Sequence, residues 1–112
     1  MEDTLPTSTF TFIANYKGGI YVRQVAAKDL MAACHIWAEQ VVSKQDIPKL
    51  NGSAFLQAFR DDMEILPPVS LQNTSNVWAF SVANRRAFML VNIVKTAESA
   101  EYPTPVPASA GI

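Results

Sequence analysis

The sequence predicts a single small α+β domain, in which two β-hairpins form a four-stranded, mostly antiparallel sheet packed with one long amphipathic helix and one short helix. Three observations predict this fold. Apolar residues alternate with a period of two near both ends of the domain, they recur with a helical period in the middle, and glycine, proline or asparagine separates these segments. The expected order is ββααββ within residues 9–96, between an N-terminal arm (1–8) and a flexible, proline-rich tail (97–112).

The first hairpin is expected over residues 9–26. Residues 9–16 alternate threonine, isoleucine and asparagine with aromatic residues and alanine, which is the period of a strand with one buried face. This alternation directs Phe10, Phe12 and Tyr16 toward the core. Two successive glycines then supply the positive φ that tight hairpin turns require, and the residues after them are β-branched and aromatic enough to form the return strand.

A long helix is expected over residues 28–42. Leu30, Cys34, Trp37 and Val41 recur at intervals of three to four, which places them on one stripe of a helix. Burying the three largest of these side chains against a sheet would contribute roughly 1.5–3 kcal/mol each. Trp37 is expected to be the most sensitive position of this helix.

A second, shorter helix is expected from residue 54 to about residue 63, with Ser53 as its N-terminal cap. Its apolar side would carry Phe55, Leu56 and Phe59. The following residues 65–76 contain two adjacent prolines and no clean period, so they are expected to form an extended connection.

The second hairpin is expected over residues 77–95, and its two strands differ in pattern. The first strand alternates, with Trp78, Phe80 and Val82 on one face, whereas the second strand, at residues 87–94, is apolar on both faces. A single helix packed on one side cannot cover both faces of such a strand.

The second face of this last strand is the expected interaction surface. It would be lined by Met89, Val91 and Ile93, together with Ile13 of the first strand. Either the short helix or the proline-containing connection covers this face within the chain, or a partner protein does. A sheet-to-sheet homodimer and pairing through an edge strand are the two ways in which a partner would bind.

Composition narrows the classes of partner. Hydrophobic residues make up 49% of the chain and charged residues only 17%, against about 25% in typical soluble domains, which favours a surface covered by a partner. The net charge of −1 supplies no general attraction for nucleic acid or anionic membranes. No apolar run approaches the ~20 residues needed to cross a bilayer. The single cysteine and the lack of a basic, apolar leader predict a cytoplasmic protein without membrane association.

No residue is predicted to be catalytic, and no cofactor or metal site is expected. Cys34 and His35 are adjacent, but neighbours on a helix point about 100° apart, and Cys34 falls on the apolar stripe. His35 and Glu39 have the i, i+4 spacing of a two-ligand metal site or a surface ion pair. Because the chain has no other histidine and no second cysteine to complete a zinc site, these two are weak candidates for a polar site.

The function expected from these features is that of a small cytoplasmic protein-interaction module, homodimeric and of the kind represented by immunity proteins, antitoxins, adaptors or phage accessory proteins. Two other functions stay open. A sheet-based nucleic-acid binder would use Arg23, Arg85 and Arg86 near the hairpin ends. A small-molecule-binding domain or enzyme would use a pocket between the long helix and the sheet, near His35 or Glu39.

Overall fold

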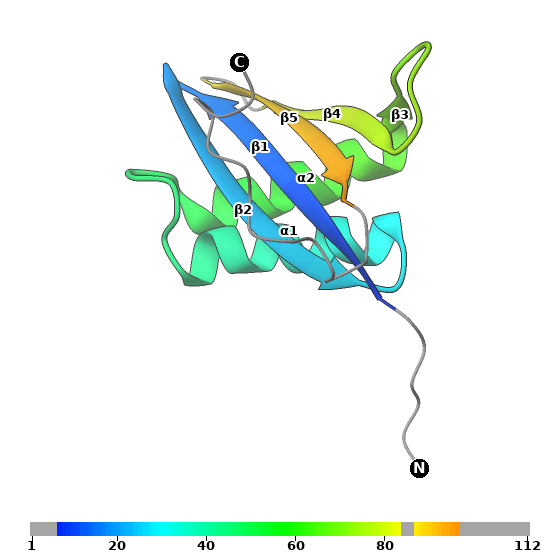
Figure 1. Ribbon diagram of the computed structural model, residues 1–112. Helices are drawn as coiled ribbons and strands as arrows, with labels where there is room; N and C mark the ends of the chain where they lie inside the picture. The colour runs from blue at the N-terminus through cyan, green and yellow to red at the C-terminus, as the bar shows by residue number, and fades with distance from the viewer. Residues whose placement is uncertain (1–6, 84–86, 97–112) are drawn as a thin grey trace, which may run out of the picture.

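The computed structural model describes residues 7–83 and 87–96, which form a five-stranded sheet with two helices on one of its faces. Seen from the side of the sheet, both helices lie behind it (Figure 1). The elements follow one another in the order β1 (Ser8–Tyr16), β2 (Gly19–Ala27), α1 (Leu30–Ser43), α2 (Gly52–Ile65), β3 (Val69–Ser70), β4 (Val77–Ala83) and β5 (Phe88–Lys95). The α+β class, both helices and the antiparallel sheet are therefore confirmed.

The sheet has the strand order β2-β1-β5-β4-β3, and every neighbouring pair is antiparallel. The expected number of four strands is wrong, because β3 adds a fifth at one edge. Val69 pairs with Ala79 and Ser70 pairs with Trp78. A strand of two residues has no period that a sequence pattern can reveal, and this one falls within the connection expected to be extended.

The turn between β1 and β2 is formed by Lys17 and Gly18, which have φ values of 49° and 82°. Positive φ at both central positions is the type I′ geometry that matches the twist of a two-residue hairpin. The turn therefore lies one residue earlier than the glycine pair suggests. Gly19 belongs to β2, and a Cβ there would collide with the Tyr21 hydroxyl.

Both helices begin with a side-chain cap. The Asp29 carboxylate accepts a hydrogen bond from the Ala32 N–H at 2.8 Å, which explains why α1 begins two residues later than expected. Asn51 caps α2 in the same way, accepting from the Ala54 N–H at 3.1 Å. The expected cap, Ser53, lies inside α2, so this helix begins earlier than predicted, and it also ends later.

The hydrophobic core lies between the sheet and the helices, with Trp37 at its centre. The Trp37 ring stacks on Phe12 with centroids 5.2 Å apart, and it meets Phe55 and Phe80 edge to face, each at 5.8 Å. These rings come from α1, β1, α2 and β4, so a single side chain joins both helices to the sheet. The buried apolar residues belong to the two helices, the four longer strands and the loop between the helices.

The two faces of β5 are the reverse of those expected. Met89, Val91 and Ile93 point toward the helices and are at most 1% exposed, so they belong to the core and not to the outer surface. The register explains this orientation, because Val91 pairs with Ala14 of β1 and Phe80 of β4, which are both buried. The outward residues of β5 are Phe88, Leu90, Asn92 and Val94.

Several expectations concern residues outside the described ranges. These include the tail 97–112, most of the arm 1–8, and both Arg85 and Arg86. Within the described residues, no helix has the length and apolar character needed to cross a membrane.

Candidate interaction surface

The face of the sheet opposite the helices is here called the open face. α1 packs on β2 and β1, and α2 packs on β4, so the described helices leave this face uncovered. It consists of Thr9, Thr11, Ile13, Asn15, Ile20, Val22, Gln24, Ala26, Val69, Val77, Ala79, Ser81, Ala83, Phe88, Leu90, Asn92 and Val94. None of these residues is charged, which is unusual for a sheet surface in contact with water.

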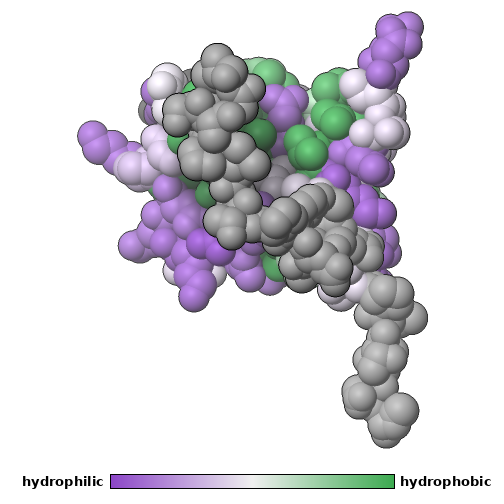
Figure 2. Space-filling model, in the orientation of Figure 1, coloured by the Kyte–Doolittle hydropathy of each residue, from purple (hydrophilic) through white to green (hydrophobic). Residues whose placement is uncertain are grey.

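Five large apolar side chains of the open face, on β1, β2 and β5, are here called the apolar patch: Ile13, Ile20, Val22, Phe88 and Leu90. Four of them are well exposed, at 66% for Ile20, 61% for Val22, 59% for Phe88 and 39% for Leu90. Ile13 is half-buried and is paired with Val22 across the strands. Figure 2 views the molecule from this side, and hydrophobic residues are visible at several places on it beside hydrophilic ones.

The rest of the open face combines small apolar residues with neutral polar groups. The Gln24 side-chain amide donates a hydrogen bond to the Thr11 hydroxyl at 2.9 Å, between the two paired strands. Asn15, Ser81 and Asn92 add further neutral donors and acceptors. Such groups can form hydrogen bonds across an interface without the large desolvation penalty of a charged side chain.

Strand β2 is one edge of the sheet, and it lacks the usual protection of an edge strand. It is nine residues long, contains no proline, and keeps an unbroken register with β1 from Gly19 to Ala27. Its single charged residue, Arg23, faces the helices and not the open face. Long regular edges of this kind are available for pairing with another chain.

The Arg23 side chain makes its polar contacts within the fold. Its guanidinium group binds the Asp46 carboxylate through two nitrogens, with Nη2 donating to Oδ1 at 2.9 Å, and it also donates to the Gln40 side chain at 3.1 Å. The hydrogen bond to Asp46 raises the pKa of Arg23, with a further contribution from the opposite charge. Of the three arginines predicted to contact nucleic acid, Arg23 is therefore bound to Asp46 and Gln40 within the fold. Arg85 and Arg86 lie outside the described residues.

Asp46→Asn is expected to lower the free energy of unfolding by about 1–2 kcal/mol, because it removes the charge from a bidentate pair whose side chains are only about a quarter exposed. The measurement is urea unfolding followed by far-ultraviolet circular dichroism. A double-mutant cycle with Arg23→Gln isolates the pair, and Lys44→Gln, at an exposed neighbouring position, is the control. A coupling energy below about 0.3 kcal/mol would show that the pairing of Arg23 with Asp46 does not contribute to stability.

Cys34, His35 and Glu39 do not form a reactive site. Cys34 is completely buried, and this burial raises the pKa of its thiol to about 12. His35 is exposed and meets the ring of Phe59 edge to face, with centroids 5.4 Å apart, while Glu39 is also exposed. Among the residues that the structure describes, no group of three histidine, cysteine, aspartate or glutamate side chains could hold a metal ion.

A pocket was expected between the long helix and the sheet, near His35 or Glu39. The best-defined cavity lies at a different place. A cavity of about 390 Å³ opens at the end of the sheet near the β1–β2 turn, and neither His35 nor Glu39 lines it. Its residues come from several strands, from α2 and from the loops between them, so no local sequence motif marks it.

Comparison with known proteins identifies no relative: no family model, no curated protein and no solved structure matches this chain.

Proposed function

We propose that this chain is a protein-interaction module that forms a homodimer by packing its open face against the open face of a second copy. The absence of charged side chains among the described residues of the open face, together with the exposed apolar patch, carries this proposal. Immunity-protein, antitoxin, adaptor and phage-accessory roles are all compatible with such a module.

A second copy is the occupant that fits this surface best. A neutral face offers no ionic attraction to a charged partner, whereas it can meet an identical neutral face without burying an unpaired charge. Two sheets pack face to face when the inner side chains interdigitate, with their strands about 30° apart. The helices, being on the far side of each sheet, would then form the two outer layers of the dimer.

The size of the open face agrees with a weak but specific dimer. The four longer strands, spaced ~4.8 Å apart and rising ~3.3 Å per residue, present a flat area on the order of 500 Å². Two such faces bury on the order of 1,000 Å² together, which is the lower bound for a specific interface. Dimerisation is therefore expected to depend on protein concentration.

The open face does not favour nucleic acid. Binding to a phosphate backbone relies on lysine and arginine, and no such residue lies on the open face. Arg23 is turned to the opposite side and is paired with Asp46. A protein partner is consequently the proposal that the described residues support.

Leu90→Lys is expected to weaken the dimer at least tenfold, because it places an unpaired charge in the centre of a desolvated interface. Sedimentation velocity from micromolar to millimolar concentration measures the effect, as a shift from twice the 12.3 kDa of the chain toward 12.3 kDa. Met31→Lys is the matched control, because Met31 is also 39% exposed but lies on α1, behind the sheet.

The position of Leu90 also separates two modes of association. It lies on the inner strand β5, so its replacement disrupts face packing but leaves the β2 edge unchanged. A wild-type chain of 12.3 kDa at every concentration would contradict the proposal. So would a Leu90→Lys variant that dimerises as strongly as the wild type, since that result would point to pairing through the β2 edge.

A further inference from the structure

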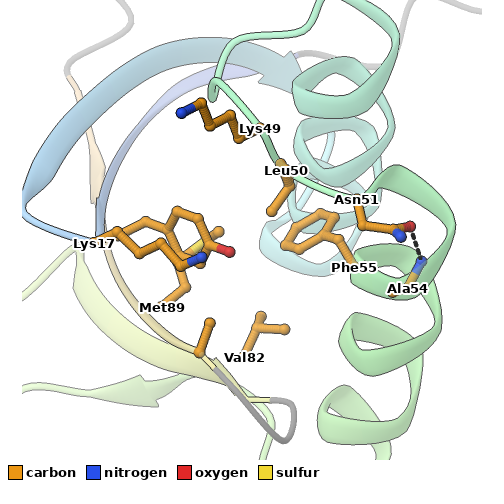
Figure 3. Close-up of a pocket in the computed structure, with 10 residues that line it drawn as sticks. Lys17, Lys49, Leu50, Asn51, Ala54, Phe55, Val82 and Met89 are labelled. Carbon is orange, nitrogen blue, oxygen red and sulfur yellow. Dashed lines mark hydrogen bonds between the residues drawn. The ribbon is translucent and has the colours of Figure 1, made fainter.

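A cleft of about 390 Å³ lies at one end of the sheet, where the β1–β2 turn meets the connection between the two helices. The β1–β2 turn contributes one wall, the connection between α1 and α2 with the first turn of α2 contributes another, and the ends of β4 and β5 complete it (Figure 3). This volume is at the lower end of the range for small-molecule pockets, which is ~300–1,000 Å³. The cleft is on the helix side of the sheet and is therefore distinct from the open face.

The floor of the cleft is apolar and belongs to the core. Phe55, Val82 and Met89 line it and are at most 5% exposed, and Leu50 closes it from the loop between the helices. Figure 3 shows Leu50 and Phe55 on one side of the open space and Met89 on the other. An apolar group inserted here would contact side chains that already pack in the core.

The rim of the cleft is positively charged. Lys17 of the β1–β2 turn and Lys49 of the connection between the helices both line it, and no carboxylate does among the residues described there. Within residues 7–83 and 87–96, neither lysine has an acidic partner within 4 Å, since the ion pair found there joins Arg23 to Asp46. The Lys17 ammonium group lies 5.4 Å from the centre of the Tyr16 ring.

We propose that this cleft binds a small organic carboxylate, with the apolar body on Phe55 and Met89 and the carboxylate at the Lys17 and Lys49 ammonium groups. An apolar floor with a few convergent polar groups at its mouth is the usual composition of a ligand site. Two lysines on separate loops act as mobile point charges, which suit a single carboxylate better than the planar, bidentate recognition that arginine provides.

Titration with 2-naphthoate, compared with neutral 2-naphthamide, tests this site with two probes of the same aromatic body. Methyl resonances of Leu50, Val82 and Met89 are expected to shift in both titrations, whereas those of Val22 and Leu90 on the open face stay unchanged. The carboxylate is expected to bind at least fivefold more tightly than the amide, because only the carboxylate interacts with the lysine charges.

Three variants make the test specific. Lys17→Gln combined with Lys49→Gln is expected to reduce the affinity for 2-naphthoate to that for 2-naphthamide, and Ala54→Phe, at an exposed lining position, is expected to block both probes. Lys28→Gln, in which an exposed lysine away from the cleft is neutralised, should change neither affinity. The Leu90→Lys variant should bind 2-naphthoate normally, which separates this proposal from that of the homodimer.

Two outcomes would overturn the proposal. One is equal affinity of the wild-type protein for the carboxylate and the amide, since the lysines would then have no role. The other is the absence of any shift at Leu50, Val82 and Met89 when 2-naphthoate reaches millimolar concentration.

Discussion

Trp37→Ala is expected to lower the free energy of unfolding by about 3–5 kcal/mol, the largest effect of any single substitution considered for this chain. Trp37 is 1% exposed and contacts aromatic rings from β1, α2 and β4. Alanine would leave a cavity between the helices and the sheet in addition to removing apolar contact. Because domains of this size are stable by only about 5–15 kcal/mol, such a loss brings the protein close to unfolding.

Urea or guanidinium unfolding followed by far-ultraviolet circular dichroism measures this effect without depending on tryptophan fluorescence. Trp37→Phe retains a ring able to stack on Phe12, so we expect it to lose less than half as much stability and to stay measurable if the alanine variant does not fold. Met31→Ala, on the exposed side of α1, is the control. A loss below about 1 kcal/mol for Trp37→Ala would contradict the central position of this ring.

Cys34 is expected to make the stability of the protein fall steeply in alkaline solution. Burial raises the pKa of the Cys34 thiol from 9.0 to about 12. Between these two pH values the unfolded chain has released a proton that the folded chain retains, so the free energy of unfolding decreases by about 1.4 kcal/mol per pH unit. Below pH 9 both states hold the proton, and the thiol adds no pH dependence.

The comparison with Cys34→Ala isolates this contribution, because every other titrating group is common to the two proteins. Alanine lowers stability by a constant amount through the small cavity that it leaves, but it removes the slope that the thiol causes. Equal slopes for the two proteins above pH 9 would show that the thiol is accessible to water. The native protein is also expected to resist a thiol-specific reagent at pH 8 until denaturant is added.

The elements with a clear period could be predicted from the sequence, and those without one could not. Both long hairpins and α1 are observed close to their expected bounds, since alternation and helical spacing are local properties that folding preserves. The strand β3 has no such property, because its two residues become a strand only by pairing with β4. Asp29 and Asn51 cap the two helices, and each helix begins two residues away from its expected start.

The sequence contains one signal for which side of β5 belongs to the open face. Residues of β5 are apolar on both sides, so hydrophobicity alone does not say which side is buried. Asn92, however, shares a side with Leu90, and a buried amide would need hydrogen-bond partners that an apolar core does not supply. This residue was the signal that Phe88 and Leu90 face outward and that Met89 faces the helices.

The cleft, in contrast, depends on long-range assembly. Lys17 and Lys49 belong to different loops and share no motif or spacing that would connect them in the sequence. They come together because β2 and α1 lead the chain away from the hairpin turn and back again to the same end of the sheet. Only the complete topology shows that their positive charges lie above an apolar floor.

The central pairing of β1 with β5 determines when the protein can fold during its synthesis. Phe12 pairs with Ile93, about 80 residues later in the chain, so the innermost strand pair joins the first strand made to the last. At roughly 5–20 residues per second, a ribosome completes β5 about 4–16 s after β1. During this interval the newly made β1–β2 hairpin exposes an unpaired inner edge, and a molecular chaperone that binds extended apolar segments would protect the chain most effectively at this stage.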